Sequence, residues 1–172
     1  MELSEICRKT LENFKVDSVK DLSEVLFTVC KENDIEKIKG FADIVQDLSI
    51  DWLQKIFQYY EADRKDKKQD FTPKSLAELV GLLVGDDTEI VDMCAGSGAL
   101  TIQKWNQNKN STFKLFELDE KVIPYLAFNM ILRNIECEIY HADVLSNEIF
   151  HVYKIEKSES FGRLKELVQC QA

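Results

Sequence analysis

The sequence predicts an α/β fold in which a helical N-terminal segment precedes an open parallel β-sheet, and three observations lead to it. Residues 1–62 contain one glycine and no proline, and their apolar side chains recur at helical spacing. From residue 71 onward, short apolar runs alternate with helical stretches, which is typical of parallel strands joined by helices. A tight loop with two glycines follows the first apolar run. We expect about three to four parallel strands.

Helix-starting residues precede the apolar stretches of the N-terminal segment. Ser18, with Asp21 three residues later, resembles a capping box. Asn33 and Asp34 interrupt the pattern, and Asp51 is placed to cap a further helix. The expected helices cover residues 18–32, 35–45 and 52–60.

A charged run at residues 63–70 is the predicted linker to a second part, residues 71–172. Pro73 lies near the start of the first helix of that part, where its missing N–H costs little. The elements expected there are, in order, a helix at 73–83, a strand at 89–93, a helix at 99–107, a strand at 112–117, a helix at 120–134, strands at 138–142 and 149–155, and a short terminal helix at 161–170.

The charge argues against tight nucleic-acid binding by this chain alone. It has 22 basic and 31 acidic residues and a net charge of -9, spread over both halves of the sequence. Contacts to phosphates need clustered cations, and the chain has no basic arm.

The cysteines and the N-terminus point to a cytoplasmic protein without a metal site. The five cysteines are odd in number and form no C-x-x-C pair, which disfavours disulfide scaffolds and zinc ribbons. The first residues are acidic rather than basic and apolar, so they do not resemble a signal peptide. No apolar run approaches the roughly 18 residues of a membrane span.

A glycine loop and three acidic residues at successive strand ends indicate a ligand-binding site. The loop at residues 96–98 follows a strand and opens a helix, whose N–H groups face a ligand. Asp92, Glu117 and Asp143 each end a predicted strand, so they converge on one crevice of the sheet. Thr101 stands where a dinucleotide fingerprint has its third glycine, so that motif matches poorly.

Residues 92–100, Asp-Met-Cys-Ala-Gly-Ser-Gly-Ala-Leu, resemble the D-P-[AC]-[CA]-G-[ST]-G motif of S-adenosylmethionine-dependent methyltransferases. They are most similar to the N6-adenine DNA methyltransferases, particularly the modification subunit of type I restriction systems. Four further segments resemble motifs of that family, in the order in which the family has them: residues 71–79, 116–119, 129–135 and 141–145. The resemblance covers roughly residues 69–148 and implies a Rossmann-like methyltransferase sheet, incomplete here.

The resemblance also implies a site for S-adenosylmethionine or its demethylated product, S-adenosylhomocysteine. The residues implied for the methionine end of the cofactor are Phe71, Thr72 and Pro73. Those implied for its centre are Asp92, Cys94, Ala95, Gly96, Ser97 and Gly98. Those implied for its ribose and adenine are Glu117, which binds the ribose hydroxyls, and Leu118, Asp143 and Val144, which meet the adenine.

The sequence departs from the family where the family holds its target amine, because an [NDS]-P-P-[YFW] motif is missing. The two prolines, Pro73 and Pro124, are 51 residues apart. No catalytic residue is therefore assigned. Four interpretations stay open: a fragment of a DNA methyltransferase, a split enzyme whose protein partner supplies the catalytic and target-recognition parts, a non-catalytic module that binds S-adenosylmethionine or another protein, and a methyltransferase that acts on another substrate without this motif. With this resemblance and a net charge of -9, we expect DNA to be bound only weakly or through a partner subunit.

Overall fold

The computed structural model describes residues 2–60 and 72–169. The predicted linker and Phe71 lie outside these residues. None of the described helices is long and apolar enough to cross a membrane.

The N-terminal segment is helical, as expected, and side-chain caps define its breaks. Its elements are α1 (Leu3–Phe14), the 3-10 turn η1 (Val19–Asp21), α2 (Leu22–Glu32), α3 (Ile35–Val45) and α4 (Trp52–Tyr60). Ser18 Oγ accepts a hydrogen bond from Lys20 N, while Asp21 makes no capping hydrogen bond. Asp34 and Asp51 cap α3 and α4 by accepting from the backbone N–H three residues later, at 3.1 and 2.8 Å.

A five-stranded sheet forms the second part, with the strands in sequence order. Its elements are α5 (Lys74–Leu83), β1 (Glu89–Asp92), α6 (Ala99–Gln107), β2 (Thr112–Glu117), α7 (Ile123–Leu132), β3 (Cys137–Asp143), β4 (Glu148–Glu156) and β5 (Arg163–Gln169). Strands β1, β2 and β3 are parallel, and β4 and β5 are antiparallel to their neighbours. The α/β fold with a partly parallel sheet is thus confirmed.

Strand β4 lies where a fourth strand was expected, but it runs antiparallel to β3. Only residues 144–147 connect the two strands, and a parallel connection needs a crossover of a dozen residues or more. Asn147, with φ +58°, completes the short turn. The parallel part of the sheet therefore has three strands.

The helix predicted at residues 161–170 is wrong, because this segment is strand β5. Gly162 N donates to Ile131 O at 2.8 Å, which brings the chain back against the end of α7. Leu164 then pairs with Ile155 of β4 and packs against the core. Pairing with β4 overrides the helical spacing of the apolar residues.

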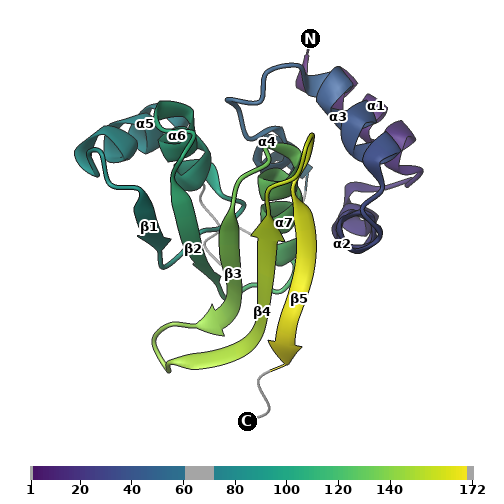
Figure 1. Ribbon diagram of the computed structural model, residues 1–172. Helices are drawn as coiled ribbons and strands as arrows, with labels where there is room; N and C mark the ends of the chain where they lie inside the picture. Colours follow the sequence, from purple (N-terminus) through teal and green to yellow (C-terminus); the bar gives the residue numbers. More distant parts are fainter. Residues whose placement is uncertain (1, 61–71, 170–172) are drawn as a thin grey trace.

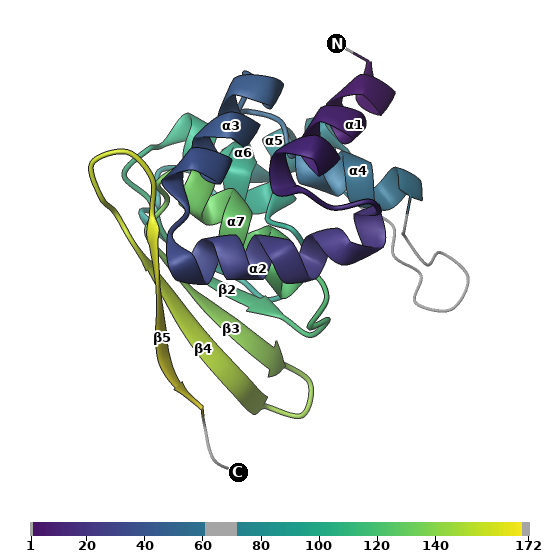
Figure 2. The ribbon, with the colours of Figure 1, turned by 90° about the vertical axis from the view of Figure 1, so that its right-hand side faces the viewer.

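The helices lie on one side of the sheet. Figure 1 shows α7 behind the strands, and Figure 2 shows the same arrangement from the side. All ten residues of α7 are buried between the sheet and the N-terminal helices. The Phe128 ring of α7 meets Phe14 and Phe41 at centroid distances of 5.5 and 5.4 Å. The N-terminal helices and the sheet therefore share one hydrophobic core.

Candidate functional site

The glycine loop between β1 and α6 is shaped by two residues with positive φ. Gly96 has φ +56° and Gly98 has φ +96°. A Cβ on Gly98 would lie 2.7 Å from Met130 Cε of α7, so this glycine allows close packing. A Cβ on Gly96 would meet nothing within 4 Å, so the backbone there faces open space. The loop is thus closed on one side and accessible on the other.

Glu117, at the end of β2, ties this loop to the neighbouring strand. Its Oε2 accepts a hydrogen bond from Gly96 N and its Oε1 accepts one from Asp119 N, both at 2.8 Å. Ala95 N donates to Phe116 O at 2.8 Å beside it. A carboxylate oxygen has two lone pairs, so both oxygens of Glu117 keep the capacity to accept from a ligand.

Asp92, at the end of β1, has a buried oxygen without a partner. Its Oδ1 accepts a hydrogen bond from Cys94 N at 3.2 Å, and its Oδ2 has no hydrogen-bond donor among the described residues. Burial raises the pKa of Asp92 above the ordinary 3.8, and the negative charge of Glu117 raises it further. The hydrogen bond from Cys94 N lowers this pKa, but by less than burial raises it. A buried oxygen of this kind fits a ligand that donates a hydrogen bond or carries positive charge.

A pocket of about 190 Å³ opens over the glycine loop. Six of the predicted site residues line it: Thr72, Cys94, Ala95, Gly96, Ser97 and Glu117. Asp119, from the motif at residues 116–119, also lines it, and so do Gln54 and Val122, which the sequence did not suggest. A second pocket of about 240 Å³ shares Gln54, Thr72 and Ala99 with it and is also lined by Pro73. The two pockets are therefore adjacent and lie between α4, α5 and the loop.

A buried polar cluster supports the loop from behind. Ser97 Oγ donates to Asp51 Oδ2 at 2.7 Å, and Asn129 Nδ2 of α7 donates to Asp51 Oδ1 and to Ser97 O, both at 2.9 Å. Arg133 donates to the oxygens of Asn129 at 3.0 and 2.9 Å. All four side chains are buried. The N-cap residue of α4 thereby fixes the conformation of the glycine loop.

Burial shifts the pKa values of the two charged members of this cluster. The pKa of Asp51 is raised above 3.8, because the loss of solvent outweighs Arg133 and the hydrogen bonds that it accepts. Burial lowers the pKa of Arg133 to about 10, although the negative charges of Asp51 and Asp47 raise it. The cost of burying these charges therefore exceeds their mutual attraction.

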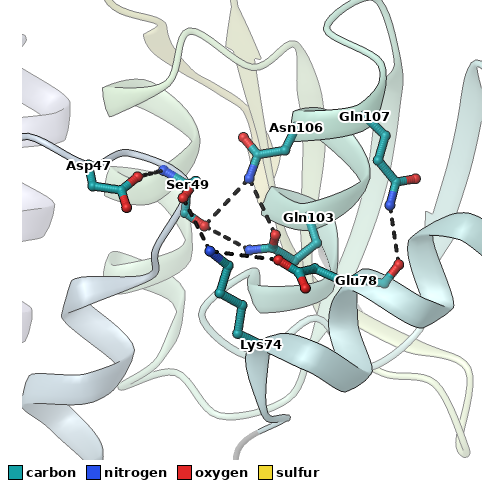
Figure 3. Close-up of polar contacts among 7 residues, drawn as sticks. All are labelled: Asp47, Ser49, Lys74, Glu78, Gln103, Asn106 and Gln107. Carbon is teal, nitrogen blue, oxygen red and sulfur yellow. Dashed lines mark hydrogen bonds and ion pairs between the residues drawn. The ribbon is translucent and has the colours of Figure 1, made fainter.

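The loop at residues 46–51 is held in place by the same neighbourhood. Arg133 donates to Leu48 O and Ile50 O at 2.8 and 2.9 Å. Figure 3 shows a second set of contacts to the same loop, in which Gln103 and Asn106 of α6 donate hydrogen bonds to Ser49 O at 2.8 and 3.4 Å. In the same view Lys74 donates a hydrogen bond to Ser49 Oγ and forms an ion pair with Glu78. Asp47 accepts a hydrogen bond from Ser49 N, and Gln107 donates one to Glu78 O. Helices α5, α6 and α7 thus all contact this loop.

A family model for N-6 DNA methylases matches residues 45–161, which is 117 of the 172 residues. The chain belongs to the N-6 DNA methylase family. The match begins at the loop that the buried cluster holds and ends just before β5. A search of the curated proteins and a search of the solved structures found no match.

The family uses S-adenosylmethionine as its methyl donor, and the residues of the pocket suit that molecule. This donor carries a positive sulfonium and a positive amino group. The carboxylates of Glu117 and Asp119 line the pocket, and their negative charge suits a ligand of opposite charge. The open space at Gly96 leaves room for the ligand against the backbone.

Five of the predicted residues that the structure describes line neither pocket, and three of them are Leu118, Asp143 and Val144. Leu118 is 57% exposed, and its carbonyl oxygen lies 3.2 Å from His141 Nε2. Asp143 Oδ1 accepts from Leu145 N and Ser146 N at 2.9 and 3.3 Å, and these hydrogen bonds lower its pKa. Val144 follows it in the same turn. Their expected contacts with the adenine stay predictions.

Two other predicted residues, Asp92 and Gly98, lie behind the pocket surface, where they shape the loop. No group of three His, Cys, Asp or Glu side chains that could hold a metal ion occurs among residues 2–60 and 72–169.

Proposed function

We propose that this chain is the S-adenosylmethionine-binding part of an adenine-specific DNA N6-methyltransferase. The observation that carries the proposal is the pocket over the glycine loop, lined by Glu117, which accepts a hydrogen bond from Gly96 N, in a chain of the N-6 DNA methylase family. The setting that we propose is DNA methylation by a restriction–modification system in the cytoplasm.

The proposed roles of the site residues follow from their hydrogen-bonding capacity. Glu117 accepts from the ribose hydroxyls with the lone pairs that its two backbone partners leave free. Asp92, which lines neither pocket, supports the centre of the site by accepting a hydrogen bond from Cys94 N at the start of the glycine loop. Thr72, which lines both pockets, and Pro73, which lines the second, are assigned to the methionine end of the cofactor.

Bound S-adenosylmethionine supplies an electrophilic methyl group, and the chain's own contribution is to orient it. The loop is held by Glu117 in front and by the Asp51 cluster behind, so its backbone is fixed before a ligand arrives. Pre-organisation of this kind lowers the entropic cost of binding and of aligning the reacting groups.

The groups that hold the target amine are proposed to come from polypeptide outside these 172 residues, either a further part of the same protein or a partner subunit. The sequence contains no [NDS]-P-P-[YFW] motif, and its net charge is -9. DNA contacts are assigned to the same additional polypeptide, because phosphate binding needs clustered cations. The alternative is a module that binds S-adenosylmethionine without transferring the methyl group.

Calorimetric titration with S-adenosylmethionine tests the proposal. The wild-type chain is expected to bind it in the micromolar range. Glu117→Ala is expected to weaken binding at least about ten-fold, because charged hydrogen bonds of this kind contribute about 1.5–3 kcal/mol each. Glu148→Ala removes an exposed carboxylate of β4 that lines neither pocket, and it serves as the matched control.

No heat of binding at millimolar ligand would contradict the proposal. Equal losses in the two variants would contradict the role of Glu117. Methyl transfer to DNA, measured with and without the polypeptide that carries the missing motif, then separates the transferase from the non-catalytic alternative.

A further inference from the structure

One edge of the sheet has no neighbour among the described residues. Strand β1 pairs with β2 on one side only, and it is the outermost strand at the left of Figure 1. A bare edge presents N–H and C=O groups that can pair with a strand from another chain.

The helix beside this edge exposes an apolar face. Helix α5 packs on α6 through Ala77 and Gly81, which are both buried. Its opposite face carries four exposed leucines: Leu76, Leu79, Leu82 and Leu83. The last two are 67% and 77% exposed, and Val91 on β1 is 58% exposed. Helix α5 and strand β1 lie together at one end of the molecule (Figure 1). Val91 is on the face of the sheet opposite to the helices, because its neighbour Ile90 packs on the core. We call the bare edge of β1, with Val91, and the exposed leucines of α5 the β1–α5 surface.

Acidic residues surround this surface. Residues 72–93 include five acidic side chains and one basic side chain, Lys74, which pairs with Glu78 at 3.6 Å. Asp86, Asp87 and Glu89 are exposed in the turn before β1 and at its start. An apolar surface with this rim favours a partner that carries lysine or arginine beside its apolar residues.

The same acids argue against a second copy of this chain. In a two-fold pairing of β1 with its copy, Glu89 would lie opposite Asp92, and like charges directly opposite are destabilising. Each copy also has a net charge of -9.

We propose that the β1–α5 surface is a docking site for a different polypeptide, which adds a strand to β1, covers the leucines of α5 and presents basic residues to the acidic rim. None of the residues of this surface lines either pocket; helix α5 contributes only Lys74 and Ala77 to the pocket lining. The inference therefore goes beyond cofactor binding, and each of the two can fail without the other.

Site-specific photo-crosslinking in cells that make the full chain tests the proposal. Benzoylphenylalanine replaces Leu83 or Val91, and the control position is Leu145, which is 96% exposed in the β3–β4 turn. We expect both surface positions, and not the control, to crosslink to one other polypeptide. Mass spectrometry should locate the crosslink in a segment of alternating apolar residues with lysine or arginine beside them.

A synthetic peptide of the crosslinked segment is then titrated against the purified chain. Leu83→Asp is expected to weaken its binding about ten-fold or more, since burying one leucine is worth about that factor. Leu145→Asp is expected to leave peptide binding unchanged. Both variants should retain the thermal unfolding of the wild type and its affinity for S-adenosylmethionine.

Three results would overturn the proposal: a crosslink to a second copy, crosslinking at Leu83 and Val91 no stronger than at Leu145, or a partner segment that is acidic. Peptide binding by a chain that fails to bind S-adenosylmethionine would support the docking site and contradict only the proposed function.

Discussion

Gly96 and Gly98 stand two residues apart in one loop, yet the structure requires glycine at each for a different reason. Gly98 lies against Met130 and Leu126 of α7, with a φ of +96° that side chains rarely adopt. Gly96 has a φ of +56°, which other residues reach at moderate cost, and its hydrogen atoms face the pocket. One glycine therefore serves packing, and the other leaves room for a ligand.

Alanine substitutions at these two glycines are expected to separate stability from binding. Gly98→Ala should lower the free energy of unfolding by about 3 kcal/mol, from the contact with Met130 and backbone strain together. Gly96→Ala should lower it by only about 1 kcal/mol, but should weaken S-adenosylmethionine binding by placing a methyl group in the pocket. Urea denaturation and calorimetry measure the two effects. Equal destabilisation by both variants would contradict this division.

Asp51 links the stability of the chain to pH. Its pKa in the folded state lies above the ordinary 3.8, because the side chain is buried. The folded chain therefore keeps a proton at pH values where the unfolded chain has released it. The stabilisation from this group is fully present below pH 3.8 and is lost as the pH rises through the raised folded pKa.

Comparison with Asp51→Asn isolates this contribution. As the pH falls from neutral toward 4, the free energy of unfolding of the wild type is expected to rise relative to that of the variant. Acids whose pKa is lowered, such as Asp34 and Asp143, affect both proteins equally and cancel in the difference. Urea denaturation at several pH values measures it, and Asp43→Asn controls for loss of an exposed carboxylate. A difference that changes in the opposite direction would contradict the assignment to Asp51.

The sequence predicts the residues of the loop but not those that support it. Gly96 and Glu117 follow from local signals, a glycine pair after a strand and an acid at the next strand end. Asp51 is recognised only as a helix cap, because its partners Ser97 and Asn129 lie 46 and 78 residues away. Contacts over such distances depend on how the helices pack, which no local pattern specifies.

At the scale of elements, the sequence predicts best where apolar spacing and end signals agree. Strand β2 and helix α6 occupy the predicted residues. The error falls on β5, where Leu164 and its neighbours have helical spacing, and pairing with β4 decides the conformation. An edge strand whose apolar and polar residues do not alternate strictly is hard to recognise as a strand from its sequence.

Alanine substitutions along β5 test its assignment as a strand. Leu164 faces Ile155 and packs on the core, while Lys165 is exposed and pairs with Glu156 at 2.6 Å. Leu164→Ala is expected to lower the free energy of unfolding by about 1 kcal/mol, and Lys165→Ala by no more than about 0.5 kcal/mol. Urea denaturation measures both. Equal effects at the two positions would contradict the alternation of a strand.

At the scale of the whole molecule, the N-terminal helices and the sheet form one packed unit. Helix α7 is buried by them on one side and by the sheet on the other, and the Asp51 cluster crosses the same boundary. The sequence shows two regions of different pattern, separated by a charged run. Their common core becomes visible only when Phe14 and Phe41 are found against Phe128.

The bare edge of β1 has a consequence for handling the protein. The acidic residues beside this edge repel the same residues of a second copy, and salt screens that repulsion: the screening length falls from about 10 Å at 0.1 M to about 3 Å at 1 M. Purification steps at high ionic strength therefore invite strand-to-strand aggregation, and the same holds near the isoelectric point of about 4.8. Neutral buffers of low ionic strength, and polymers rather than salts as precipitants, suit the isolated chain.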